Sequence, residues 1–579
     1  MFANGIVQTL SWWPLFWVRP ESYNEKPNMR IALLDILRSE FKDYGAVSLR
    51  KDLMAGINVA AVALPLSLAF GIASGATGPA GLVTAILAGI IIGILGGIPN
   101  QVSGPTGAMS AVLLVVAKDF GLEGVWMTTL LAGTMILIIG ILRLGQVVLL
   151  IPRPVVTGFT SGIAVIIFTG QLHNILNAPA ATGTTAVSKW LEFVGRWQAG
   201  QLSVDWHTLL TAGIVIAVMF LLPKRLSRVL PASLVGVALA MGMTVLLGFA
   251  EPVVGSVPRG LLLDQRLVFS ERMLPLSQQV FIPALSVAVL CCLQALLSGT
   301  VCANLTGRKM DTDQELISQG LGNMIIPFFG GVPATGAVAR TRVGIASDGQ
   351  TRLTTVFHGL TLFLVLVLAG SVIERIPIAA LSGVLIVTTI RMNDWKDIRW
   401  MFRHRFKTAI AGFLVTMLAT AVFDLTSAIL IGVGLSAAAF ISRISAVDVT
   451  KAAVDVKHLE AKGHQLNNKA HDIDVAYVTG PLFFAATANF RKLLDVSDQE
   501  RKKYLILSMR GVPLVDIGGL ELIEELWERQ RSHGGELLLA AVQPNVKRML
   551  DRAHLTREIG EHNIFWSADQ AILAASNRL

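Results

Sequence analysis

The sequence predicts an all-α polytopic membrane domain followed by a small α/β domain, and hydropathy and charge distribution carry this prediction. The chain of 579 residues is 53% hydrophobic and 15% charged, with a mean hydropathy of +0.62. Soluble chains carry roughly a quarter charged residues. Charge is sparse between residues 55 and 445, whereas residues 446–579 resemble an ordinary soluble sequence. We expect a cytoplasmic or interfacial segment at 1–54, a membrane domain at 55–446, a polar linker at 447–469 and a soluble domain at 470–579.

Fourteen apolar segments follow one another in the membrane domain. They lie near 55–77, 80–98, 105–117, 125–142, 154–176, 207–223, 230–248, 279–303, 316–329, 336–346, 353–373, 376–390, 408–423 and 424–442. The third, ninth and tenth are too short to cross a hydrocarbon core of roughly 30 Å as straight helices. Seven spans per half is an odd number, so the second half is inverted relative to the first. We expect two inverted seven-span repeats with half-helices at spans 3 and 10.

Lysine and arginine gather in connections that follow even-numbered segments, as at 224–228, 308–309 and 391–407. The positive-inside rule places these connections, both termini and the soluble domain on the cytoplasmic side of the inner membrane. The net charge of +9 therefore reflects orientation in the lipid bilayer and does not indicate a nucleic-acid partner.

Nearly the same phrase occurs twice, as GPTGAMSAV at 104–112 and PATGAVART at 333–341. In each half it falls in the third segment, where a proline precedes a short apolar helix. Non-helical backbone at membrane depth is tolerated only where it is buried in protein or lines a water-filled cavity. Two half-helices that start near the midplane would point their N-termini at one another. Each N-terminus carries unpaired N–H groups and about +0.5 of a charge.

This arrangement predicts an anion site built largely from backbone. Gly107 and Gly336 would allow close approach of the ligand, and Thr106 and Thr335 would cap or contact it. The alternative is that the small residues serve only helix packing.

Arg340 is the expected charged member of this site. No aspartate or glutamate lies inside the fourteen segments, since Asp424 and Glu374 sit at segment ends, and Arg340 and Arg342 are the main deep ionisable side chains. An unpaired arginine at the bilayer centre costs about 3 kcal/mol even on the lenient scale, so a bound anion is an attractive partner. Arg340 lies four residues after Gly336 and shares the face of the helix start, whereas Arg342 points nearly opposite. The alternative for Arg340 is a structural role, donating to unwound backbone carbonyls.

These motifs resemble those of the SulP anion-permease family from about residue 45 to the end. The resemblance rests on ALPLSLAFGIASG at 63–75, VSGPTGAMSAV at 102–112, PRPVVTGFTSG at 152–162, ELISQGLGNMIIPFFGGVPATGAVARTRV at 315–343 and FDLTSAILIGVGLSA at 423–437. It implies a secondary transporter, not an enzyme, for a small inorganic or carboxylate anion such as sulfate, bicarbonate, chloride or a dicarboxylate. It also implies a core and a gate domain, elevator-like movement of the core, and a homodimer.

The substrate pocket that we expect lies among the first, third, eighth and tenth segments, and no cofactor or metal is expected in it. It comprises Leu66, Phe70, Thr106, Gly107, Ala108, Gln294, Gly336, Ala337, Val338, Ala339 and Arg340.

The eighth segment departs from the family pattern. Many bacterial members have an acid, associated with proton or sodium coupling, where this chain has Gln294 in LQALLSG at 293–299. Glutamine neither titrates nor holds a cation by charge, so we expect anion exchange or uncoupled transport. The alternative for Gln294 is an ordinary interhelical hydrogen bond.

The soluble domain resembles the STAS domain usual in this family. The runs at 472–484, 503–509 and 536–542 predict strands, and those near 486–495 and 518–534 predict helices, giving a partly parallel sheet. Bacterial signalling versions phosphorylate a serine at the start of a helix. Here DIGG at 516–519 puts Gly518 at that position, so we expect no phosphorylation there and expect Asp516 to cap the helix.

Two other function classes remain open on the sequence. A nucleobase–cation symporter has a similar fourteen-span plan, but such carriers hold the base with acidic side chains that these segments lack. A membrane sensor without transport could signal or scaffold through the soluble domain.

Overall fold

The computed structural model describes residues 29–148, 153–176, 185–201, 205–223, 230–268, 273–423, 448–454, 472–483 and 502–579, with a few single residues between these ranges. The chain divides into two compact units, Met1–Val433 and Gly434–Leu579, each with its own apolar core. Most of the predicted fourteenth segment, and the helix predicted near 486–495, lie outside the described residues.

Each of the first thirteen predicted segments contains a helix. The helices are α3 (Ala46–Ala73), α4 (Gly78–Leu87) with the π-turn η2 (Ala88–Ile92) and α5 (Gly93–Leu95), α6 (Gly107–Ile141), α8 (Arg153–Ile175), α10 (Trp206–Leu221), α12 (Ala232–Leu247), α14 (Phe281–Thr306), α15 (Thr312–Ile325) with the 3₁₀ turn η3 (Ile326–Phe329), α16 (Val338–Ala346), α17 (Leu353–Ile373), α18 (Ile378–Met392) and α20 (Lys407–Val422). Among the described residues, six helical stretches are long and apolar enough to cross a membrane. The connections contain α2 (Met29–Glu40), α7 (Gly145–Val148), α9 (Ala186–Gln198), α13 (Met273–Gln279) and α19 (Trp395–Arg403).

α6 contains two of the predicted segments, and a glycine breaks the helix between them. Gly121 adopts φ +67° and ψ −169°, a conformation that glycine reaches without the steric cost of a side chain. The helical run that begins at Gly107 therefore ends at this break, and a second run continues to Ile141. The third predicted segment is thus a short helix of its own.

The first long helix begins earlier than predicted. α3 starts at Ala46, nine residues before the boundary that hydropathy placed at 55. The charges of this stretch misled the prediction because one of them is buried and satisfied. Asp52 is 0% exposed and accepts backbone N–H groups of Gln350 and Thr351 at 2.6 and 3.0 Å.

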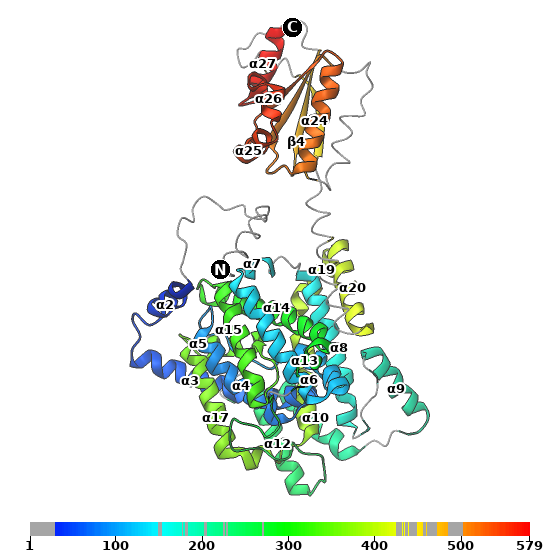
Figure 1. Ribbon diagram of the computed structural model, residues 1–579. Coiled ribbons are helices and arrows are strands. Elements are labelled where there is room, and N and C mark those ends of the chain that lie inside the picture. Colours follow the sequence, from blue (N-terminus) through cyan, green and yellow to red (C-terminus); the bar gives the residue numbers. More distant parts are fainter. Residues whose placement is uncertain are drawn as a thin grey trace. The chain divides into compact units, whose positions relative to one another are not determined.

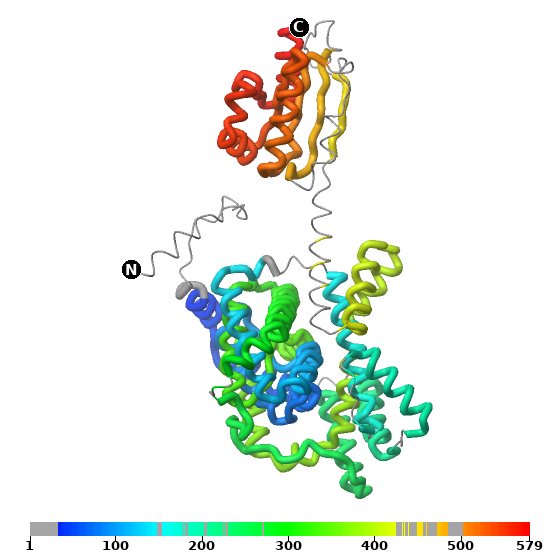
Figure 2. Tube along the Cα trace, turned by 45° about the vertical axis from the view of Figure 1, so that its right-hand side comes forward, coloured from blue at the N-terminus to red at the C-terminus, as the bar shows by residue number. Residues whose placement is uncertain are grey.

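The long helices of the first unit sort into two groups by packing. In one group, α6 packs against α14 and α15, and α17 packs against α3 and α4. In the other, α8 packs against α18 and α20, and α10 packs against α12 and α18. Figure 2 shows blue and green segments interleaved in the first group, and cyan and yellow-green segments together in the second. We call these the α6 group and the α8 group.

The second unit is a five-stranded sheet with helices on both faces (Figure 1). The strands are β3 (Asp448–Ala453), β4 (Ile473–Thr479), β5 (Tyr504–Gly511), β6 (Glu536–Ala540) and β7 (Ile564–Phe565), in that order across the sheet. β3 is antiparallel to β4, and the other neighbours are parallel. α24 (Ile517–Ser532), α25 (Pro544–Arg552) and α26 (Leu555–Ile559) pack on one face, and α27 (Ala568–Arg578) on the other. Asp516 caps α24 by accepting the Gly519 N–H at 2.9 Å, as predicted.

The predicted linker at 447–469 is wrong at its start. Residues 448–453 form the edge strand β3, and Val449 packs against the apolar core. This strand is mostly exposed, so its polar composition resembles that of a linker.

We expect a fragment of residues 446–579 to melt at least 5 °C above a fragment of residues 470–579, since a loss of about 1 kcal/mol lowers the melting temperature of such a domain by roughly 4–8 °C. The shorter fragment lacks β3 and exposes the edge of β4. Scanning calorimetry measures the difference. Val449→Ser in the longer fragment should lower the midpoint, with Thr450→Ser on the same strand as the control. Equal midpoints for the two fragments would show that β3 is dispensable.

Candidate functional site

The two copies of the repeated phrase lie side by side and pair with one another. Ser103–Gly104 forms strand β1 and Thr335–Gly336 forms strand β2, antiparallel, with Ser103 opposite Gly336 and Gly104 opposite Thr335. The pairing extends by one bond, in which the Ala337 N–H donates to the Val102 carbonyl at 2.8 Å. Segments more than 200 residues apart in the sequence are thereby joined inside a helical unit.

Buried polar side chains satisfy the extended backbone around this pair. Asn323 of α15 accepts the Ala334 N–H and donates to the Ala334 carbonyl, both at 2.8 Å. Thr341 of α16 accepts the Val102 N–H at 3.0 Å, and Thr84 of α4 accepts the Val332 N–H at 2.8 Å. Non-helical backbone at membrane depth needs such internal partners, because lipid supplies none.

A helix begins just beyond each strand. Thr106 precedes α6 and Ala337 precedes α16, both with extended backbone, and neither side chain caps its helix. The first-turn N–H groups are therefore available to another acceptor. The start of α16 differs from the prediction. In the second phrase the extended chain continues two residues further than in the first phrase before the helix begins. Thr335 is consequently no cap: it is 0% exposed and donates to the Cys291 carbonyl at 3.1 Å.

Arg340 occupies the first turn of α16 and is 2% exposed. One terminal nitrogen, Nη2, donates to the Pro105 carbonyl at 2.6 Å, which is the contact expected of a structural role. The other, Nη1, is buried and has no hydrogen-bond partner within the described part of the chain. A cation in a first turn opposes the helix dipole, at a cost of roughly 0.3–1 kcal/mol. Arg342, by contrast, is exposed.

Contacts connect the four predicted segments. The Thr106 hydroxyl donates to Gln294 Oε1 of α14 at 2.9 Å. A Cβ at Gly107 would lie 3.0 Å from Cε1 of Phe70 in α3, so this ring packs over the start of α6. A Cβ at Gly336 would lie 3.0 Å from Cβ of Ser298 in α14. Gly336 therefore permits a close approach of protein to protein, within β2 and before the helix start.

The remaining predicted residues differ in exposure. Leu66, Ala337 and Val338 are half-buried, and Ala339 is exposed, so the start of α16 is open on one side. Ala108 is 1% exposed and packs in the apolar core.

Sequence reasoning missed a buried carboxylate beside this site. Glu315, in the first turn of α15 and one residue before the predicted ninth segment, is 1% exposed. It accepts the Gly97 N–H at 2.9 Å and the side-chain amides of Gln101 and Gln319 at 3.0 and 2.9 Å. Gln319 also donates to the Ser103 hydroxyl at 2.9 Å, so the carboxylate supports β1. The four-residue spacing of Glu315 and Gln319 on one helix face was the available signal.

Comparisons with known proteins agree with this fold. The sequence profile of the sulfate permease family matches residues 49–419, and that of the STAS domain matches residues 467–571. The chain is 32% identical over 543 residues to YvdB of Bacillus subtilis (strain 168), covering 92% of this chain and 98% of that protein. It is 27% identical over 548 residues to the bicarbonate transporter BicA of Picosynechococcus sp., covering 91% and 94%. The solved structure of SLC26A9 matches with a TM-score of 0.82 at 18% identity, covering 94% of this chain and 92% of that one, a likeness of fold.

Fold and sequence together define a multi-pass helical membrane protein with a C-terminal α/β domain of the STAS type. The chain belongs to the sulfate permease family of anion transporters, as its motifs predicted.

Gly104→Ala tests whether the position of Arg340 matters. A Cβ there would lie 2.5 Å from Arg340 Nη1, and the flexible guanidinium would have to move. We expect uptake of labelled sulfate or bicarbonate into proteoliposomes to fall roughly 10-fold or more, since a hydrogen bond to a charged group is worth about 1.5–3 kcal/mol. Gly213→Ala in α10, where the added methyl meets nothing within 4 Å, is the control. Undiminished uptake by the Gly104 variant would contradict this role of the guanidinium.

Proposed function

We propose that the protein is a secondary transporter that moves a small inorganic or carboxylate anion across the inner membrane by alternating access. The observation that carries this proposal is the β1–β2 pair. An uncapped helix start follows each strand, and a guanidinium with a nitrogen unpaired among the described residues lies in the first turn of α16. Family membership supplies the class of solute. Sulfate, bicarbonate, chloride and dicarboxylates are the candidates, and bicarbonate is the solute named for BicA.

The charges favour an anion at this place. Each helix start contributes about half a positive charge, and Arg340 adds a full one. Glu315 forms no ion pair with Arg340 among the described residues, and its oxygens accept hydrogen bonds from neutral backbone and amide N–H groups. No ion pair to Arg340 occurs among the described residues. A bound anion would accept from Nη1 and from first-turn N–H groups, which are charge-assisted hydrogen bonds.

The two helix groups suggest how access alternates. The site residues belong to the α6 group, which corresponds to the expected core, and the α8 group corresponds to the gate. A Cβ at Gly107 would lie 2.5 Å from Cδ1 of Ile167 in α8, so the gate packs against the start of α6. We propose that the core slides past the gate like an elevator and withdraws the site from this contact. The fourteen-span inverted repeat, cytoplasmic termini and a homodimer belong to the same proposal.

Gln294 bears on the coupling of transport. Its side-chain oxygen accepts the Thr106 hydroxyl, so this glutamine orients the residue before α6. A neutral amide there supplies neither a titrating group nor a charge for a cation. We propose anion exchange or uncoupled transport on this basis.

Arg340→Gln should lower the affinity for the transported anion by roughly 30-fold, because one charge-assisted interaction of about 2 kcal/mol is lost. Radiolabelled uptake into proteoliposomes, run over a panel of sulfate, bicarbonate, chloride and a dicarboxylate, measures this effect. Arg342→Gln on the same helix is the matched control, since that side chain is exposed, and we expect a change within about 2-fold. Equal losses in both variants would point to general damage. An unchanged Arg340 variant would move the site elsewhere.

We expect that neither an imposed proton gradient nor a sodium gradient drives accumulation of the anion by the wild-type protein. A counter-anion inside the vesicle should accelerate uptake if exchange operates. Gln294→Glu is the matched variant, because it places a titratable carboxyl beside the Thr106 hydroxyl, and we expect its uptake to acquire a dependence on pH. Uphill uptake by the wild type under either gradient would refute the argument from Gln294.

A further inference from the structure

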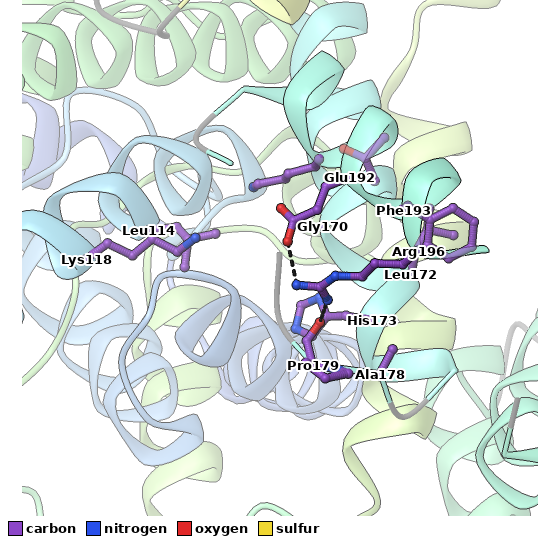
Figure 3. Close-up of a pocket in the computed structure, with 12 residues that line it drawn as sticks. Leu114, Lys118, Gly170, Leu172, His173, Ala178, Pro179, Glu192, Phe193 and Arg196 are labelled. Atoms are coloured by element: carbon purple, nitrogen blue, oxygen red, sulfur yellow. Dashed lines mark hydrogen bonds and ion pairs between the residues drawn. The ribbon is translucent and has the colours of Figure 1, made fainter. Parts of the chain in front are cut away.

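A cavity of about 100 Å³ lies where α8 ends and α9 packs beside it, and none of its lining residues belongs to β1, β2 or α16. This volume is well above the roughly 15 Å³ that one water molecule needs. Its walls come from both helix groups. Leu114 and Lys118 belong to α6, Thr169 to His173 lie near the end of α8, and Lys189 to Arg196 lie on α9 (Figure 3).

The lining of this cavity is basic. Its ionisable members are Lys118, His173, Lys189, Glu192 and Arg196. Glu192 is the single acid among the lining residues, and it forms an ion pair with Arg196 one turn further along α9. Arg196 also donates to the Pro179 carbonyl at 2.8 Å, as the dashed lines in Figure 3 mark. Glu192 is therefore paired with Arg196 of the same helix.

Lys189 is the unusual member of this set. Its side chain is 6% exposed, and no acceptor among the described residues receives a hydrogen bond from Nζ. A Cβ at Gly170, another wall residue, would lie 4.0 Å from Nζ, which places the ammonium at the cavity wall. Burying a charge without a partner is costly, and buried charges in proteins are normally paired. A bound anion would supply such a partner.

We propose that this cavity is a second anion site, which binds a small inorganic anion between the α6 group and α9. Lys189 is the principal contact, and Lys118 approaches from the opposite group. The site lies at the ends of the short first run of α6 and of α8, and Arg340 is not among its lining residues. In the orientation that the positive-inside rule predicts, this end faces outward, so the site would receive anions on the outer side and bridge core and gate there.

The charge state of Lys189 agrees with this role. Burial, with a further contribution from Lys118, lowers the pKa of Lys189 to about 8. The ammonium is therefore present at neutral pH and is lost as the pH rises above 8. Lys118 from α6, His173 from α8, and Glu192 and Arg196 from α9 line the same cavity and are the other groups whose charge acts on the bound anion.

The test uses thermal unfolding of the full-length protein in detergent, with sodium sulfate as the probe and sodium gluconate, whose anion is larger, at equal ionic strength as the reference. The identity of the anion class rests on the proposed function, so binding at the inner site is first weakened by Arg340→Gln. In this background we expect sulfate still to raise the midpoint by several degrees, because ligand bound to the folded state stabilises it. The shift should shrink between pH 7 and pH 9.5.

Adding Lys189→Met should abolish the sulfate-dependent shift while raising the midpoint in gluconate, because the variant no longer buries an unpaired charge. A higher midpoint without ligand also shows that the variant folds. Lys309→Gln, at an exposed position, is the control and should leave the shift intact. A shift that survives Lys189→Met places the sulfate elsewhere. A shift present in the wild type but absent after Arg340→Gln leaves the proposed function standing and overturns the second site.

Discussion

Four residues of paired backbone, Ser103–Gly104 with Thr335–Gly336, join two parts of the membrane unit that lie more than 200 residues apart in the sequence. A helical bundle has no intrinsic need of a strand pair, and extended chain at this depth leaves polar groups that lipid cannot satisfy. The pair meets part of that requirement, and Asn323, Thr341 and Thr84 meet more of it. Each strand is then followed by a helix start, and Arg340 from the first turn of α16 reaches the Pro105 carbonyl just before α6. In the proposed function, this pairing allows the partial positive charges at the N-termini of α6 and α16 to act on the same anion.

Two buried charges near the pair illustrate the difference between support and function. Glu315 is held by three N–H donors, one from backbone and two from glutamine side chains. A carboxylate so satisfied is part of the scaffold, and removing any one donor would leave buried charge uncompensated. Arg340 has one carbonyl at Nη2 and no protein partner at Nη1 among the described residues. An arginine held on one side and open on the other is suited to bind a solute that comes and goes. In the proposed function, the contact at Nη2 positions the guanidinium for the anion.

The sequence predicted much of this arrangement because hydropathy and a repeated phrase are strong signals. Each of the first thirteen apolar segments contains a helix, and the two phrases lie side by side. The failures have physical causes. Hydropathy cannot distinguish a solvated charge from a buried, hydrogen-bonded one, which hid Glu315 and put the start of α3 too late. The edge strand β3 is exposed and polar, so its composition resembled a linker. The α16 start is two residues later than predicted, so Ala337 and not Thr335 precedes this helix. This offset depends on the long-range pairing of the strands, which a short sequence motif does not encode.

We propose that the two helix starts and Arg340 hold the anion. Locating a heavy sulfate analogue in the protein tests this site most directly. Selenate can be diffused into crystals of the full-length protein, and anomalous scattering of selenium then marks its position. We expect a peak between the first turns of α6 and α16, within hydrogen-bonding distance of Arg340 Nη1. A protein that transports selenate but shows no selenium peak at that position would contradict the account.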